Sequence, residues 1–279
     1  MPKASSGLWL AVFLSAAASA ADRVDWMSVI EPPSVVAEGP SAGQGGEELD
    51  ARILARELPR FDWKIESARP LRVIHEMETR DGVCSFGFIP LPGRERTMVF
   101  NLRPILMPGY GVIVREDRLA DFQPYLGADG AIDLVRFRDA PLTGGYVGVR
   151  PHVDALKDFI EDNHRRVRLI PAGENGSVFK QVIGRRTDFA LVLRDEANYF
   201  AEQAASEIRL VSLPITGPDR WTPAYIGCSS GPVGRRVMAA IDVFLADDRH
   251  WAEFLEPWRR WLSPEDYNAA LIYHTSPVR

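Results

Sequence analysis

The feature that most constrains the fold is an alternation of strand-like and helix-like segments near the start of the chain. Three short apolar runs, rich in strand formers, are separated by two segments with helical spacing of apolar residues. The runs cover residues 24–30, 61–67 and 83–89, and the helical segments cover 47–58 and 71–79. This order typically builds a parallel sheet with helices on its faces. We therefore predict an α/β domain.

The same alternation restarts in the middle of the chain. Strand-like segments alternate with apolar helical stripes, the strands at 110–114, 132–137, 146–149, 167–170 and 189–193 and the stripes at 153–160 and 178–183. After Leu213 the pattern becomes helical, with a helix start at Ser263-Pro264. The chain shows neither an internal repeat nor a low-complexity linker, so we expect extended strands to join two α/β units.

Composition excludes several classes of protein. The 279 residues suffice for one or two domains, and 46% hydrophobic residues exclude wholesale disorder. The net charge of −5, without clustered cations, argues against a nucleic-acid partner. The five His and two Cys lack the spacing of metal ligands. We expect no metal and no cofactor.

The Gly-rich segment 38–46 precedes a helix, where phosphate-binding loops also lie. Such a loop continues with Lys and Ser or Thr after its last Gly, whereas here Glu47 and Glu48 follow. Two carboxylates repel phosphate. We interpret the segment as a turn and a helix start.

Residues 1–20 have the pattern of a secretory signal peptide. Lys3 precedes an apolar run at 8–17, and Ala18-Ser19-Ala20 gives the small residues of a cleavage site. The run is about half of the roughly 20 residues that a membrane span needs. We expect cleavage after Ala20, with Ala21 as the neighbouring option, and a soluble exported protein without a lipid anchor.

Export changes the interpretation of Cys84 and Cys228, the two cysteines of the chain. Two thiols in an oxidising compartment usually form one disulfide, which we expect here. Two buried free thiols are the alternative, since the sequence does not show whether the Cβ atoms approach bonding range.

A candidate anion site follows the strand at 83–89. Arg94-Glu95-Arg96 comes after a Pro-Leu-Pro-Gly turn, and open α/β sheets bind ligands beyond the carboxyl ends of their strands. Arg presents a planar, permanently charged fork that suits carboxylates. The alternative is a solvated pair of charges on a loop.

Several short motifs together resemble the extracytoplasmic solute-binding proteins of polar amino-acid transporters, which have the type II periplasmic binding protein fold. They are Trp26-x4-Glu31-Pro32-Pro33, the Gly-rich lead into a helix, Cys84 with Arg94-x5-Phe100, Gly184-Arg185-Arg186-Thr187-Asp188-Phe189, and Cys228 with Gly234-Arg235. The last is similar to a divergent branch that contains cysteines.

The resemblance implies two α/β lobes joined by a double-crossover hinge. Each lobe is expected to hold a mixed or mostly parallel sheet flanked by helices. Lobe 1 would comprise residues 21–110 and 215–279, and lobe 2 residues 111–214, with the crossings near 108–114 and 209–222.

The resemblance also implies a set of ligand contacts. In this family the Arg six residues before Phe binds the α-carboxylate of the ligand, and Arg94 holds that position. The acid at the end of the first strand lines the cleft, and Glu31 holds that one. Trp26, Pro33 and Ser34 would lie near it.

This sequence departs from the family's pattern at several of these positions. The hydroxyl residues usually found five and seven residues before that Arg are Ile89 and Gly87 here. The acid that neutralises the α-ammonium of the ligand falls on Leu193, with Asp195 two residues later.

The function that the resemblance implies is that of a monomeric periplasmic solute-binding protein, without catalytic residues. The lobes would close around a small anionic or zwitterionic solute and present it to an ABC-type permease or a sensor domain. One alternative is a dehydratase-like cleft enzyme, which needs a general acid and a general base. Glu31 is the only carboxylate that the sequence assigns to the cleft. The other alternative is an exported protein that binds a partner without any solute.

Overall fold

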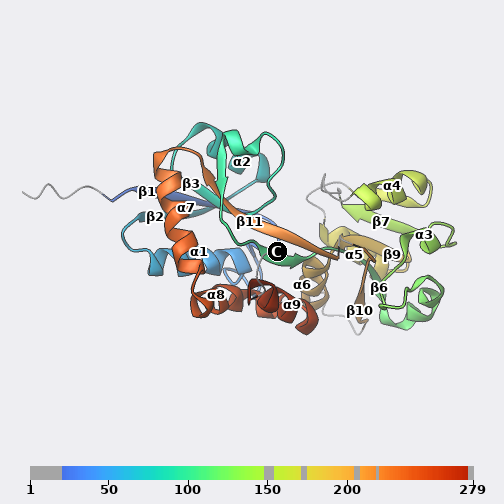
Figure 1. Ribbon diagram of the computed structural model, residues 1–279. Helices are drawn as coiled ribbons and strands as arrows, with labels where there is room; N and C mark the ends of the chain where they lie inside the picture. Colours follow the sequence, from blue (N-terminus) through green and yellow to red (C-terminus); the bar gives the residue numbers. More distant parts are fainter. Residues whose placement is uncertain (1–20, 148–153, 171–174, 204–207, 218–219, 276–279) are drawn as a thin grey trace, which may run out of the picture.

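The computed structural model describes residues 21–147, 154–170, 175–203, 208–217 and 220–275, and these form two lobes, each built on one sheet (Figure 1). The signal peptide predicted for residues 1–20 lies outside these ranges. Within them, none of the helices is both long and apolar enough to cross a membrane.

The sheet of lobe 1 has the strand order β2-β1-β3-β11-β4, with β5 paired to β11. The first three strands along the chain are parallel to one another, and β11 runs antiparallel to its neighbours. The strands are β1 (Arg23–Val29), β2 (Asp62–Ala68), β3 (Val83–Phe88), β4 (Met98–Phe100), β5 (Ile105–Pro108) and β11 (Trp221–Ser229).

Both faces of this sheet are covered by helices. One face packs against α1 and the C-terminal helices around Trp26, and α2 covers the other face around Met27. Consecutive residues of a strand point to opposite faces, so these neighbours serve two different cores. The helices are α1 (Gly46–Glu57), α2 (Pro70–Thr79), α7 (Pro232–Leu245), α8 (Asp248–Leu255), the 3-10 helix η5 (Glu256–Arg260) and α9 (Pro264–Thr275).

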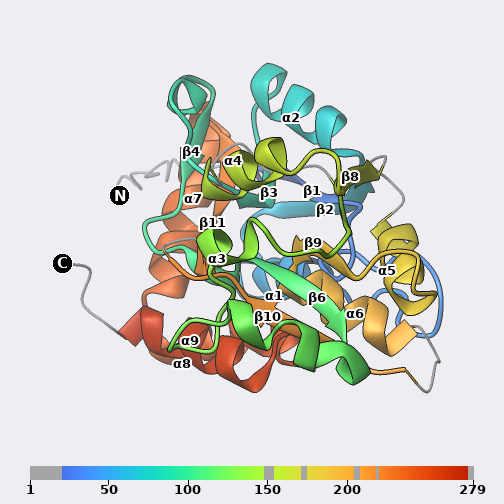
Figure 2. The same ribbon diagram turned by 90° about the vertical axis from the view of Figure 1, so that its right-hand side faces the viewer.

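The sheet of lobe 2 has the order β10-β6-β9-β7-β8, and Figure 2 looks towards this lobe. Here β7, β8 and β9 are parallel, and β6 is antiparallel to both of its neighbours. The strands are β6 (Tyr110–Arg115), β7 (Gly144–Val147), β8 (Val167–Ile170), β9 (Phe189–Leu193) and β10 (Leu210–Pro214), with helices α3 (Leu134–Phe137), α4 (Asp154–Asp162), α5 (Asn175–Ile183) and α6 (Arg194–Gln203) and 3-10 helices η2 (Glu116–Asp121) and η3 (Gln123–Tyr125).

One predicted strand of this lobe is wrong. Residues 132–137 were expected to be extended, but Leu134–Phe137 form the short helix α3. Asp133 caps it, because its side chain accepts hydrogen bonds from the backbone N–H groups of Val135 and Arg136. An Asp in front of an apolar segment is a helix-start signal that the strand prediction overlooked.

The chain passes between the two sheets twice. It leaves lobe 1 at Gly109, between β5 and β6, and returns through the segment between β10 and β11. The prediction that the chain is helical after Leu213 is wrong for this return, since Trp221–Ser229 form the long strand β11. The sequence pattern does not indicate this strand, because it contains Pro223 and Gly227, and both residue types are unusual in strand interiors.

The predicted disulfide is confirmed. Cys84 on β3 lies directly opposite Cys228 on the antiparallel strand β11, with a Cα–Cα distance of 4.1 Å, and the two sulfurs are bonded. Both residues are fully buried. The bond joins the two parts of the chain that form lobe 1.

Besides the two crossing segments, helix α6 of lobe 2 connects the lobes through side-chain contacts. Its first residue, Arg194, forms a buried ion pair with Asp266 of α9, with Nη2 2.8 Å from Oδ1. The indole N–H of Trp221 also donates to Asp266, at 3.2 Å. Farther along α6, the Asn198 amide donates to the carbonyl of Trp261 at 2.8 Å. This helix therefore rests on the C-terminal helices of lobe 1.

Candidate functional site

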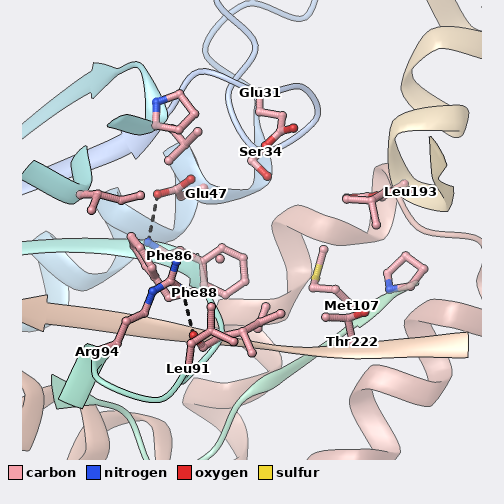
Figure 3. A pocket seen from close by; sticks show the side chains of 18 residues that line it. Glu31, Ser34, Glu47, Phe86, Phe88, Leu91, Arg94, Met107, Leu193 and Thr222 are labelled. Carbon is pink, nitrogen blue, oxygen red and sulfur yellow. Dashed lines mark hydrogen bonds between the residues drawn. The ribbon is translucent and has the colours of Figure 1, made fainter. Parts of the chain in front are cut away.

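A cavity of about 330 Å³ lies where the two lobes meet. It opens beside the carboxyl ends of β1 and β3 and next to the crossing strands β5 and β11 (Figure 3). Lobe 2 contributes Leu193 and Asp195, at the junction of β9 and α6. The lining from lobe 1 is Val29, Glu31, Ser34, Glu47, Pro70, Ile74, Phe86, Gly87, Phe88, Ile89, Leu91, Arg94, Met107, Pro108, Thr222 and Ala224.

The parallel strands determine this position. The carboxyl ends of β1 and β3 meet at one edge of the sheet, where α1 also begins. The segment after β1 is held against the start of α1 by Glu48, whose carboxylate accepts hydrogen bonds from the N–H groups of Gly45 (3.0 Å) and Val36 (3.1 Å). This arrangement brings Glu31 and Ser34 to the cavity.

Arg94 brings a positive charge to the lining of this cavity. Gly93 adopts a left-handed conformation (φ 94°) that turns the chain into the 3-10 helix η1 (Arg94–Arg96). The guanidinium then donates to the carbonyl of Ile89 at 2.9 Å and lies over the ring of Phe88, 5.5 Å from its centroid. These contacts fix its direction. Arg96 is exposed and does not line the cavity.

Three of the residues proposed from the resemblance line the same cavity: Glu31, Ser34 and Arg94. Trp26 and Pro33 do not. Trp26 is fully buried in the core between the sheet and α1, because its side chain points to the opposite face of β1 from Met27. The expectation that it lies at the ligand is therefore wrong.

Pro33 has a backbone role beside the site. Its side chain is buried away from the cavity lining, and its carbonyl accepts a hydrogen bond from the N–H of Gly46 at 3.0 Å. That bond ties the loop after β1 to the first turn of α1.

Sequence reasoning missed Glu47, the second residue of α1. Its side chain lines the cavity although the residue is only 1% exposed. One carboxyl oxygen accepts from the N–H of Phe86 (3.2 Å) and the hydroxyl of Ser85 (3.5 Å), and Ser28 and the Val29 N–H also donate to this carboxyl. Burial outweighs these donors and raises the pKa of Glu47 to about 8. The acid at the helix start after the Gly-rich segment was the available signal.

Asp50 lies one turn farther along α1 and is fully buried. It accepts a hydrogen bond from the indole N–H of Trp258 at 2.7 Å. Burial raises its pKa well above the usual range, and the charge of Glu47 acts in the same direction. Asp50 does not line the cavity and holds the C-terminal segment on α1.

The charges that line the cavity are unequal. Glu31, Glu47 and Asp195 bring three carboxyl groups, and Arg94 is the single cation in the lining that the described ranges supply. The sequence assigns only Glu31 to the cleft, whereas Glu47 and Asp195 also line the cavity. Most other lining residues are apolar. The same ranges contain no cluster of three His, Cys, Asp or Glu side chains that could hold a metal ion.

Comparisons with known proteins identify the fold. A scan against models of protein families gives no match, and a search of curated proteins gives none either. An ancestral cationic amino acid solute binding protein is similar in structure, with a TM-score of 0.61 and 16% identity over 86% of this chain and 96% of its own.

Two further solved structures agree with it. The probable amino-acid ABC transporter extracellular-binding protein ytmK from Bacillus subtilis has a TM-score of 0.59 and 13% identity, over 88% of this chain and 99% of its own. A histidine kinase sensor domain with similarity to periplasmic binding proteins has a TM-score of 0.58 and 15% identity, over 86% and 96%. The chain therefore has the two-lobe fold of the type II periplasmic binding proteins.

Proposed function

We propose that this protein is an extracytoplasmic solute-binding protein that captures a small, amino-acid-like solute between its two lobes. The observation that carries the proposal is the position of Arg94, a cation fixed at the carboxyl end of a strand and facing an otherwise acidic and apolar interlobe cavity. A charge-assisted pair with a ligand carboxylate is among the stronger polar contacts. The solved structures with this fold include solute-binding proteins, which supports the same role.

The site has the composition of a binding pocket for a small molecule. Apolar side chains such as Phe88, Met107 and Leu193 form most of its wall, and a few charged groups are fixed in place. The cavity of about 330 Å³ suits a ligand of amino-acid size. Contributions from both lobes would allow the ligand to stabilise their closure.

The location and partners are part of this proposal. The signal-peptide pattern at residues 1–20 supports export to the periplasm. There the closed, monomeric protein would present its solute to an ABC-type permease or to a sensor domain. Both roles occur among the structures that share the fold.

A cleft enzyme is the second candidate, and Glu47 is the observation that favours it. A carboxyl group with a pKa of about 8 is protonated at neutral pH and can act as a general acid. Glu31 and Asp195 line the same cavity and could supply a base. Proton NMR of any bound metabolite, recorded over hours with the protein, separates the two candidates, since a binding protein returns its ligand unchanged.

A thermal-shift screen tests the proposed function. The protein without residues 1–20 is heated with a library of metabolites that includes amino acids, carboxylic acids and amines. A ligand at 100 times its dissociation constant stabilises the folded state by about 2.7 kcal/mol, which raises the melting temperature of a protein of this size by roughly 5–10 °C. We expect such a shift from compounds that carry a carboxylate. A library without any stabilising compound would contradict the proposal.

A further inference from the structure

We propose that Glu47, which enters the cavity from the first turn of α1, contacts a positively charged nitrogen of the ligand. Binding of such a ligand would then change the protonation state of Glu47. This inference rests on the proposed function, because it concerns the same cavity. It assigns the ligand a second charged group beside the carboxylate that faces Arg94.

The first support is the construction around the Glu47 carboxyl group. It enters the cavity from the first turn of α1 and is held from two strands, by Ser28 and Val29 of β1 and by Ser85 and Phe86 of β3. Such donors stabilise a carboxylate, as does the start of a helix. Burial opposes the charge. Burial outweighs these donors in the empty pocket, so Glu47 holds a proton there, and a positive charge on the ligand would restore the charged form.

The second support is the set of charged groups around the Glu47 carboxyl group. Glu31 comes from the loop after β1, Asp195 from α6 across the cavity, and Asp50 from the next turn of α1. Arg94 is the cation from η1, and its guanidinium already donates to a carbonyl. Figure 3 shows Glu47 between Glu31 and Ser34 on one side and Arg94 on the other. Among the described residues, the neighbourhood of Glu47 thus contains more acids than cations.

This imbalance selects the ligand. A purely anionic ligand would satisfy Arg94 but would add its charge beside the carboxyl groups of Glu31 and Asp195, and Glu47 would keep its proton. A ligand with both a carboxylate and an ammonium or guanidinium group satisfies both ends of the site. Because a desolvated cation favours the charged form of a nearby carboxyl, the nitrogen keeps its proton and Glu47 loses its own to solvent.

The number of protons released can be measured. With a pKa of about 8, Glu47 is protonated in roughly nine-tenths of the empty protein at pH 7. If it is charged in the complex, binding releases close to one proton. By linkage, the affinity then rises about tenfold between pH 6 and pH 7. An anionic ligand would keep the proton in place and would show neither effect.

Isothermal titration calorimetry in phosphate and imidazole buffers, which both take up protons between pH 6 and pH 7 and differ in ionisation enthalpy, counts these protons. The twenty standard L-amino acids are the probes, and the tightest binder is titrated into the wild type, Glu47→Gln and Asp50→Asn at pH 6 and pH 7. Asp50→Asn is the matched control, because Asp50 is a buried acid on the same helix that does not line the cavity.

We expect the wild type and Asp50→Asn to release about 0.9 proton per ligand and to gain about tenfold in affinity at the higher pH. Glu47→Gln should release none and bind equally at both values. Binding to the wild type without proton release, or with proton uptake, overturns the inference and leaves the proposed function standing. Equal release from Glu47→Gln also overturns it. If none of the amino acids binds, the amino-acid-like ligand of the proposed function fails, and this inference fails with it.

Discussion

Removal of the Cys84–Cys228 disulfide should cost a large part of the stability of the protein. The two cysteines are 144 residues apart in sequence, and lobe 2 lies entirely inside the loop that the bond closes. For a loop of this length, the chain-entropy relation gives about 5 kcal/mol of stabilisation through the unfolded state. The bond is fully buried between β3 and β11, so reductant should reach it only after unfolding.

Urea unfolding of the wild type and of a Cys84→Ala/Cys228→Ala variant measures this contribution. We expect the free energy of unfolding to fall by about 4–5 kcal/mol. Thiol titration of the unreduced, denatured wild type should find no free thiol. A difference below about 1 kcal/mol would refute the entropic argument, and two free thiols would refute the disulfide itself.

Three other predictions concern single side chains. Arg94→Ala should weaken binding of a carboxylate ligand by about 2–5 kcal/mol in calorimetry, whereas Arg96→Ala should bind normally; unchanged affinity of Arg94→Ala would make Arg94 a surface charge. Asp266→Asn leaves the buried Arg194 without its ion partner and should lower the free energy of unfolding by about 3–5 kcal/mol. A loss under about 1 kcal/mol would mean that this ion pair does not stabilise the fold. The pKa of Glu47 lies above its unfolded value of about 4.5, so the contribution of this group to the free energy of unfolding is fully present below pH 4.5 and is lost towards pH 8. In urea melts, the free energy of unfolding of the ligand-free protein should fall by roughly 3 kcal/mol between pH 5 and pH 8. That of Glu47→Gln should fall by less, and identical profiles would contradict the raised pKa.

The sequence predicted the elements whose signals are local. Apolar runs bounded by Gly, Pro or charged residues correspond to β1, β3 and β9, and the apolar stripes correspond to α1 and α5. The strand β11 could not be found in this way. Its conformation depends on pairing with β3 on one side and with β4 and β5 on the other, which only the folded chain provides.

The same distinction applies to the site. Arg94 could be found because a cation after a buried strand has a known position in an α/β sheet. Glu47 was missed although its place at a helix start after the Gly-rich segment was a signal, because an acid in the first turn of a helix usually stabilises the helix from the surface. Its burial depends on how α1 packs against β1 and β3. Trp26 was misplaced because both faces of its strand are buried, so alternation alone does not tell which face meets the ligand.

The proposed function requires that a small carboxylate-bearing solute binds between the lobes. A crystal structure of the protein with the tightest ligand from the screen tests it most directly. We expect the ligand in the cavity between the lobes, with its carboxylate within hydrogen-bond distance of the Arg94 guanidinium and a charged nitrogen beside Glu47. A ligand bound elsewhere on the surface, or one in the cavity whose carboxylate faces away from Arg94, would contradict it.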